Sequence, residues 1–179
     1  MPRFVVLLRG VNVGKANRVH MAEFKAMLES LGYTQVKTLL NSGNAVFASA
    51  GRATEKHAKS IAASLQEKFA VATPVVVKSE VEFKAAVTGN LSAPPEAEWS
   101  RFLVAFGPDK AVLQALEPLR SLARKPESFA IGTAAAYLHC PEGLLASKAA
   151  ESMLGKAGRG VTTRNWATVL KLEALLSAA

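Results

Sequence analysis

The segment best equipped for chemistry in this chain is a run of hydrogen-bond donors near its start, Arg9-Gly10-Val11-Asn12-Val13-Gly14-Lys15-Ala16-Asn17-Arg18. Its glycines can turn backbone N–H groups outward, and its arginine, lysine and asparagine side chains add donors without negative charge. The apolar run at 4–8 predicts a buried strand, so the segment leaves that strand's carboxyl end, a common position for ligand sites. These residue types in this place predict an anion-binding loop.

The two glycines of this loop complete no nucleotide-binding motif. A P-loop needs one more residue between Gly10 and Gly14, and it needs Ser or Thr where Ala16 stands, to hold magnesium. The spacing also differs from the Gly-x-Gly-x-x-Gly of dinucleotide-binding folds. The alternative interpretation is that Gly10 and Gly14 only shape a tight connection between a strand and a helix.

Two further donor-rich segments are expected beside this loop. Asn41-Ser42-Gly43-Asn44 predicts the turn of a β-hairpin. Thr162-Thr163-Arg164-Asn165 is expected at the start of the final helix, where unpaired N–H groups attract anions. We expect the guanidinium groups of Arg9 and Arg164 to share one concave, electropositive site. The predicted ligand-binding residues are Arg9, Asn12, Gly14, Ser42, Asn44, Arg164 and Asn165.

Each segment also has a purely structural interpretation. The hairpin residues tolerate positive φ and are typical of turns. Thr163 or Asn165 would cap the final helix while Trp166 packs in the core. Arg9 is different, because an arginine at the end of so apolar a strand needs a carboxylate or a bound anion as partner.

The sequence contains no recognisable catalytic constellation. Asp109 is the only aspartate and follows Pro108, where a helix N-cap belongs, so paired-aspartate metal sites are excluded. The three histidines lack ligand spacing, and a single cysteine cannot build a zinc motif, so no metal site and no cofactor are predicted. His139 and Cys140 point to opposite faces of a strand, and Cys140 is expected to be buried. Catalytic residues remain unassigned, and whether the chain is an enzyme stays open.

Hydrophobic periodicity predicts the order β-α-β-β-α-β in the first half. Ser79 with Glu82 forms a capping box that opens a further short helix ending at Val87. The predicted ranges are a strand at 3–9, a helix from 21 to 31, hairpin strands at 36–40 and 45–48, a helix at 54–69 and a strand at 74–77.

The same order then recurs in the second half. The run 101–107 echoes 3–8, with Arg101-Phe102 matching Arg3-Phe4. A helix at 109–117, strands at 127–131 and 134–140 and a helix at 147–154 follow, and a final helix at 165–176 stands where a fourth strand would be.

The predicted fold class is therefore α+β, with two ferredoxin-like halves packed as one unit and ending in a C-terminal helix. The halves are 1–88 and 99–179, joined by a linker at 89–98, within a single unit of 1–179. Because the runs 4–8, 75–77 and 102–106 are apolar at successive positions, both faces of each sheet are expected to be covered.

The chain is basic, with a net charge of +8 over 179 residues, collected in residues 1–50 and again at the tail. This balance favours anionic partners, including nucleic acid. RNA-recognition modules of related topology stack bases on strand aromatics, and the matching strands here carry Ala45-Val46-Phe47 and Ala135-Ala136-Tyr137. Only weak, salt-sensitive phosphate contact is therefore expected from nucleic acid.

The lone cysteine excludes an intrachain disulfide and favours a reducing compartment. The opening apolar run is too short for a signal peptide, and nothing approaches the length of a membrane span. We expect a cytoplasmic protein with no membrane partner. The oligomeric state cannot be read from the sequence.

Three motifs resemble the signatures of a bacterial family, domain of unknown function 1697 (DUF1697). They are Leu8-Arg9-Gly10-Val11-Asn12-Val13-Gly14, Asn41-Ser42-Gly43-Asn44-Ala45-Val46-Phe47 and Thr163-Arg164-Asn165-Trp166-Ala167-Thr168-Val169. The resemblance covers essentially the whole chain and implies a small cytoplasmic α+β protein with no assigned activity.

The chain departs from the family pattern in two places. The family's usual Gly-Gly-Lys-Asn stands here as Gly14-Lys15-Ala16-Asn17. Its Pro-Asp-Gly-x-Gly-Arg-Ser-Lys resembles Pro141-Glu142-Gly143-Leu144-Leu145-Ala146-Ser147-Lys148, which lacks a glycine and an arginine.

The leading functional hypothesis is a protein that binds a small phosphate- or carboxylate-bearing molecule at a basic pocket. The alternatives are a non-specific nucleic-acid-associated protein, and a structural or interaction protein without a ligand.

Overall fold

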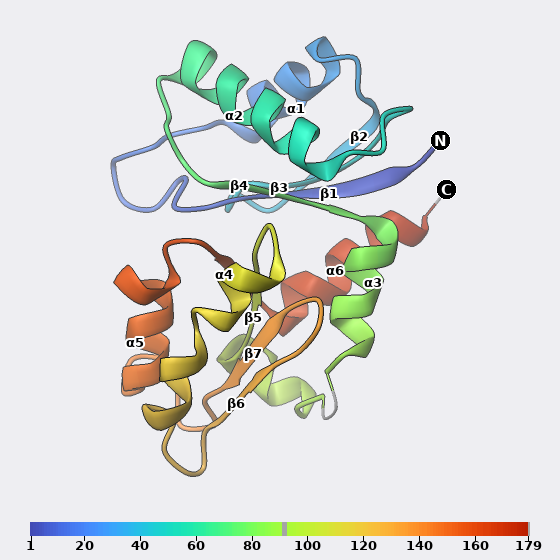
Figure 1. Ribbon diagram of the computed structural model, residues 1–179. Coiled ribbons are helices and arrows are strands. Elements are labelled where there is room, and N and C mark those ends of the chain that lie inside the picture. The colour runs from blue at the N-terminus through green and yellow to red at the C-terminus, as the bar shows by residue number, and fades with distance from the viewer. Residues whose placement is uncertain (91–92, 179) are drawn as a thin grey trace. The chain divides into compact units, whose positions relative to one another are not determined.

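The computed structural model describes residues 1–90 and 93–178 of the chain (Figure 1). The chain forms two compact units, one made of Met1–Phe83 with the segment from Leu172 onward, the other of Lys84–Lys171. The boundaries fall inside two helices, α3 (Glu80–Thr88) and α6 (Trp166–Ser177). Each unit is a mixture of helices with one four-stranded antiparallel sheet.

The first unit has the predicted order of elements. Its sheet runs β2-β3-β1-β4, with α1 and α2 together on one face (Figure 1). The elements are β1 (Arg3–Leu8), α1 (Met21–Ser30), β2 (Thr34–Leu39), β3 (Asn44–Ala48), α2 (Thr54–Phe69) and β4 (Val75–Ser79).

β1 is the central strand of this sheet. It pairs with β3 along one edge, where Phe4 lies opposite Phe47, and with β4 along the other, where Leu8 lies opposite Val75. Phe4 and Leu8 pack in the core formed with α1 and α2, while Val5 and Leu7 on the opposite face are also fully buried. The prediction that both faces of this strand are buried is confirmed.

The predicted hairpin is confirmed, and its turn depends on one glycine. β2 and β3 pair on either side of residues 40–43. Gly43 has a φ of +81°, and a Cβ atom there would lie 2.6 Å from the Cβ of Leu8. A side chain would therefore be strained by the backbone and would also strike the end of β1.

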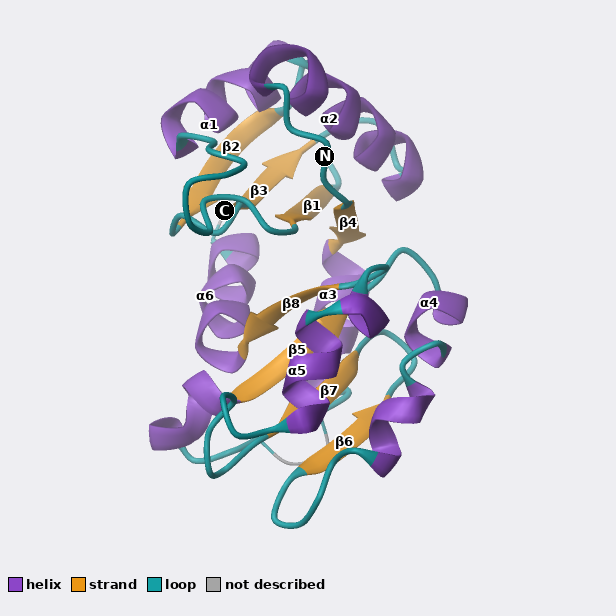
Figure 2. Cartoon of the chain, turned by 90° about the vertical axis from the view of Figure 1, so that its left-hand side faces the viewer, coloured by secondary structure: helices purple, strands orange, loops and turns teal. Residues whose placement is uncertain are grey.

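The second unit repeats the strand order as β6-β7-β5-β8 (Figure 2). Its core lies between the sheet and the short helices α4, η2 and α5. With α3 and α6, the elements are η1 (Glu96–Arg101), β5 (Phe102–Phe106), α4 (Lys110–Gln114), η2 (Glu117–Ser121), β6 (Ser128–Ile131), β7 (Ala136–His139), α5 (Lys148–Leu154), η3 (Lys156–Gly158) and β8 (Thr162–Asn165).

The prediction for residues 162–165 was wrong. They do not begin the final helix but form β8, where Arg164 lies opposite Val104 of β5, and α6 starts at Trp166. The strand is only four residues long and has an arginine at a buried position, so its pattern lacks the apolar signal expected of a covered strand.

The sequence echo between the two central strands does not mark structurally equivalent residues. Phe4 packs in the core with α1 and α2, whereas Leu103 and Ala105, not Phe102, pack in the core with α4, η2 and α5. Since successive strand residues point to opposite faces, matching Phe102 to Phe4 is off by one position.

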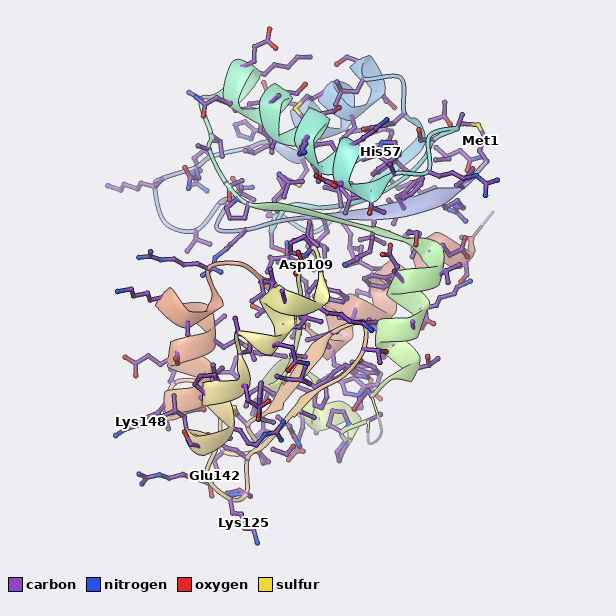
Figure 3. All side chains as sticks on the ribbon, in the orientation of Figure 1. Met1, His57, Asp109, Lys125, Glu142 and Lys148 are labelled. Carbon is purple, nitrogen blue, oxygen red and sulfur yellow. The ribbon has the colours of Figure 1, made fainter. Side chains whose placement is uncertain are left out.

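Both predicted caps are confirmed. Glu82 Oε2 accepts a hydrogen bond from the Ser79 backbone N–H at 2.8 Å, and Ser79 Oγ accepts one from the Glu82 N–H at 3.3 Å. Asp109, labelled in Figure 3, accepts a hydrogen bond from Val112 N at 3.0 Å at the start of α4. Cys140 is fully buried, as expected.

Both tyrosines of the chain are buried and hydrogen-bonded. Tyr33 Oη lies 2.9 Å from His57 Nδ1, and His57 Nε2, on α2 (Figure 3), lies 3.0 Å from the carbonyl of Gly51. A carbonyl only accepts, so Nε2 carries the hydrogen, and when the ring is neutral the Tyr33 hydroxyl donates to Nδ1. The Tyr137 hydroxyl donates to the carbonyl of Ala86. Burial raises the pKa of both tyrosines, that of Tyr137 to about 12.

Replacing Gly43 with Ala should destabilise the first unit by roughly 2–4 kcal/mol, because overpacking adds to the cost of a left-handed backbone. The matched control is Gly14→Ala, where φ is +65° but no atom lies within 4 Å of the added Cβ. It should cost only about 1 kcal/mol. Urea denaturation measures both, and equal losses would contradict the proposed clash with Leu8.

The raised tyrosine pKa values predict an alkaline limit to stability. A folded pKa above the unfolded value of about 10 gives stabilisation that is complete below pH 10 and is lost as the pH rises toward 12. In native protein, absorbance at 295 nm should show no tyrosine ionisation near pH 10, whereas protein in guanidinium should ionise there. Tyr137→Phe should lose less stability between pH 10 and 12 than the wild type does.

Candidate functional site

Three segments of the first unit meet at one end of its sheet. Leu8 N donates to the carbonyl of Gly43 in the hairpin turn at 2.9 Å, and Arg9 N donates to the carbonyl of Pro74, just before β4, at 3.2 Å. The Thr73 hydroxyl donates to the carbonyl of Arg9. Residues 9–20, called the basic loop below, therefore start beside the hairpin turn and the start of β4 (Figure 1).

Asn12 closes the basic loop. Its Nδ2 donates to the carbonyls of Val19 and Asn41, both at 2.7 Å, and its Oδ1 accepts from Val19 N at 2.8 Å. Its φ of +57° lies in the left-handed region, which asparagine tolerates. The side chain thus ties the two ends of the loop to each other and to the hairpin turn, and its donors are used inside the protein.

Asn44 is also used internally. It is fully buried at the start of β3, and its Nδ2 donates to the carbonyl of Leu39 at 3.1 Å and to Ser42 Oγ at 2.8 Å. Ser42 is exposed at the turn. These bonds match the structural interpretation of the hairpin, in which Ser42 and Asn44 stabilise the turn.

The middle of the basic loop faces solvent. Gly14, Lys15, Asn17 and Arg18 are all exposed, and the carbonyl of Asn17 accepts from Asn12 N at 3.0 Å. Four residues of the loop have positive φ: Gly10, Asn12, Gly14 and Asn17. Left-handed residues interspersed in a loop favour concave arrangements of backbone N–H groups, which bind anions.

The three segments that meet at this sheet end contain basic but no acidic residues. The basic loop contains Arg9, Lys15 and Arg18, and neither it nor segments 40–44 and 70–74 contain an acidic residue. α1 begins directly after the loop, and its N-cap residue His20 makes no side-chain capping bond, although Glu23 lies in the first turn. Arg9 is half-buried and the other two cations are exposed.

Lys15, Arg18 and Thr73 belong to this candidate site but were missing from the predicted ligand-binding residues. The charge of the loop pointed to the first two, and no sequence signal pointed to Thr73.

Arg164 and Asn165 lie in the second unit. Arg164 on β8 is buried, and one of its guanidinium nitrogens donates to Thr162 Oγ1 at 2.7 Å and to the carbonyl of Thr163 at 2.8 Å. Burial lowers the pKa of Arg164 to about 10, so the group keeps its charge at neutral pH. Asn165 Oδ1 accepts from Thr168 N at 3.0 Å, which caps α6, and Trp166 is buried. The structure thus groups the other five predicted residues in the first unit and these two in the second.

Among residues 1–90 and 93–178, no group of three or more His, Cys, Asp or Glu side chains is placed to hold a metal ion. None of the described helices combines the length and apolar character needed to cross a bilayer. The chemistry offered at the basic loop is positive charge and hydrogen-bond donation.

Comparison with known proteins places these features in a family. The sequence profile of a protein family of unknown function, DUF1697, matches residues 1–137. A solved structure, the conserved bacterial protein SP0830 from Streptococcus pneumoniae, is similar with a TM-score of 0.77 and 28% sequence identity. The similarity covers 98% of this chain and 99% of that one. No curated protein matches the sequence.

Replacing Asn12 with Gly keeps a residue that tolerates positive φ but removes the three side-chain bonds that close the basic loop. We expect a loss of about 1–3 kcal/mol and faster hydrogen exchange of the amides at 13–19. The matched control is Asn17→Gly, at a φ of +52°, which loses a single 3.3 Å bond to the carbonyl of Gly10. Unchanged exchange in the Asn12 variant would show that the loop is held by other contacts.

Proposed function

Because the chain belongs to the DUF1697 family of proteins of unknown function, we propose its function from its own geometry. The first unit binds a small phosphate- or carboxylate-bearing molecule at the basic loop. The ligand's negative group lies against the outward part of the loop, near Gly14, Lys15 and Arg18, with Arg9 at the end of β1 behind it.

The observation that carries this proposal is a basic loop closed by its own internal bonds. Asn12 holds the loop ends, so little further ordering is needed when a ligand arrives, and a preorganised site has a smaller entropic cost of binding. The three cations of the loop have no carboxylate within the three segments that meet there. Their positive charge would attract an external anion.

The predicted residues take different roles in this proposal. Asn12, Ser42 and Asn44 shape the loop and the turn, and Gly14 allows the backbone to approach the ligand closely. Arg164 and Asn165 belong to the second unit, and the proposed site does not include them. The site therefore consists of the basic loop and its supports.

Two finer statements accompany the proposal. We propose that each unit is a ferredoxin-like fold, which is supported by the strand orders β2-β3-β1-β4 and β6-β7-β5-β8 with helices between the strands. We also propose a cytoplasmic location, which is supported by the single, buried cysteine.

Thermal denaturation with inorganic phosphate, citrate and AMP tests the proposed function. A ligand at one hundred times its dissociation constant adds about 2.7 kcal/mol, or roughly 5–10 °C for a chain of this size. Lys15→Ala/Arg18→Ala and Arg9→Ala should each reduce the shift at least several-fold. Lys56→Ala removes an exposed positive charge from α2 and should leave the shift unchanged. If none of the three compounds shifts the transition, or if Arg9→Ala keeps the full shift, the proposal fails.

Salt dependence separates this function from non-specific nucleic-acid association. Binding of single-stranded DNA through diffuse positive charge should weaken steeply between 50 and 200 mM salt, at a rate set by the number of phosphate contacts, on the order of ten- to a thousandfold. A small anion contacts few cations and should lose less affinity. DNA binding that survives the loop variants would favour the diffuse alternative.

A further inference from the structure

One face of the second sheet carries aromatic and titratable groups. The apolar core of this unit uses Leu103 and Leu138, so the residues that alternate with them, Phe102, Tyr137 and His139, share the other face. The rings of Phe102 and Tyr137 lie 6.3 Å apart, and those of Phe102 and His139 lie 5.6 Å apart. Trp166 meets the Phe102 ring edge to face at 5.5 Å.

A cavity of about 240 Å³ opens on this face. Two aromatic rings and several small residues line it, among them Ser128, which lies opposite His139 in the sheet. The lining residues are Gly89, Asn90, Phe102, Ser128, Ala130, Ile131, Gly132 and Tyr137.

Two glycines allow the Tyr137 ring to form a wall of the cavity. A Cβ at Gly89 would lie 2.9 Å from the Tyr137 hydroxyl oxygen, and one at Gly132 would lie 3.2 Å from Cε2. The hydroxyl hydrogen is used by the carbonyl of Ala86, so Tyr137 presents its ring rather than its donor. The cavity thus has aromatic walls and glycine edges.

A histidine–carboxylate pair stands beside the cavity. His139 Nε2 lies 3.0 Å from Glu98 Oε2, and their side chains are 19% and 25% exposed. An ionised carboxylate only accepts, so Nε2 carries the hydrogen, and when the ring is neutral Nδ1 keeps its lone pair. Within the described part of the chain, no protein group hydrogen-bonds to Nδ1.

The pair is positioned by a bridge at the start of β5. Arg101 donates to the carbonyl of Pro141, which follows β7, and to the carbonyl of Ala97 in η1 at 3.4 Å. Its own carbonyl accepts from Cys140 N at 2.9 Å. η1 is thereby held next to the end of β7, which keeps Glu98 at His139.

We propose that this cavity is a second binding site, for a small heteroaromatic molecule whose ring N–H donates to Nδ1 of His139. An apolar cavity of about 150 Å³ holds benzene, so about 240 Å³ suits one ring or a fused pair. The walls supply aromatic contact, and the acceptor on His139 supplies polarity and orientation. The site lies in the second unit and does not depend on the anion site of the first.

Titration calorimetry of the full chain with benzimidazole at pH 8 tests the site. Indene has the same shape but lacks the N–H and should bind about tenfold more weakly, as loss of one hydrogen bond predicts. His139→Phe should weaken benzimidazole binding about tenfold and remove the preference over indene. Ala130→Leu, at an exposed position of β6, fills the cavity without touching the pair and should weaken both compounds at least tenfold.

Nitrogen-15 spectra of histidine-labelled protein provide a second readout. Benzimidazole should change the Nδ1 resonance of His139 and leave those of His20 and His57 unchanged. Equal affinity for benzimidazole and indene in the wild type, or undiminished binding to His139→Phe or to Ala130→Leu, would overturn the proposal. So would the absence of benzimidazole binding at millimolar concentration, a result that leaves the anion site of the first unit untouched.

Discussion

β1 is hydrogen-bonded along both edges and buried on both faces, and the placement of polar groups in the first unit follows from this. With β3 on one side and β4 on the other, residues 4–8 of the strand are all buried. Polar chemistry associated with it must lie at its ends. At the carboxyl end, the backbone of Leu8 and Arg9 bonds to the hairpin turn and to the start of β4, so three connections are drawn together around Arg9. The basic loop stands where the buried strand meets water.

The features that could be predicted from the sequence are those that depend on local residue patterns. A run of successive apolar residues identified β1, and the turn residues 41–44 identified the hairpin, because both depend on local chemistry. The caps at Ser79 and Asp109 are equally local. β8 was missed because it is a strand only through its tertiary pairing with β5, and its residue types do not predict that pairing. The helix predicted at 109–117 is observed as the shorter α4, and the separate 3-10 helix η2 begins at Glu117, because the pattern of apolar residues cannot distinguish one helix from two short ones.

At the candidate site, residue type alone did not predict the role of each side chain. Asparagine donors suggested anion recognition at Asn12 and Asn44, but both side chains are used by backbone carbonyls within the loop and the turn. An amide can serve either purpose, and only the path of the chain decides between them. The exposed cations Lys15 and Arg18 are the reverse case, because nothing in their spacing separates them from ordinary surface charges. We include them in the proposed anion site because the basic loop starts beside a turn and a strand end whose segments contain no carboxylates.

The two units share one strand order but place their polar groups differently, and a shift of one residue accompanies this difference. Phe4 packs in the core with α1 and α2, while Phe102, its apparent counterpart, lies on the sheet face opposite the core formed with α4, η2 and α5. Since a one-residue slip turns every side chain of a strand to the other face, the aromatic ring of β5 leaves the helix-facing core and meets Tyr137, His139 and Trp166 instead. The first unit therefore concentrates its polar groups at the end of the sheet, in a loop. The second places them on the sheet itself, where β7 supplies a histidine, η1 a carboxylate and β5 an aromatic wall. The two sheets therefore keep the same strand order, while a one-residue difference in side-chain register decides which residues of the central strand face the core.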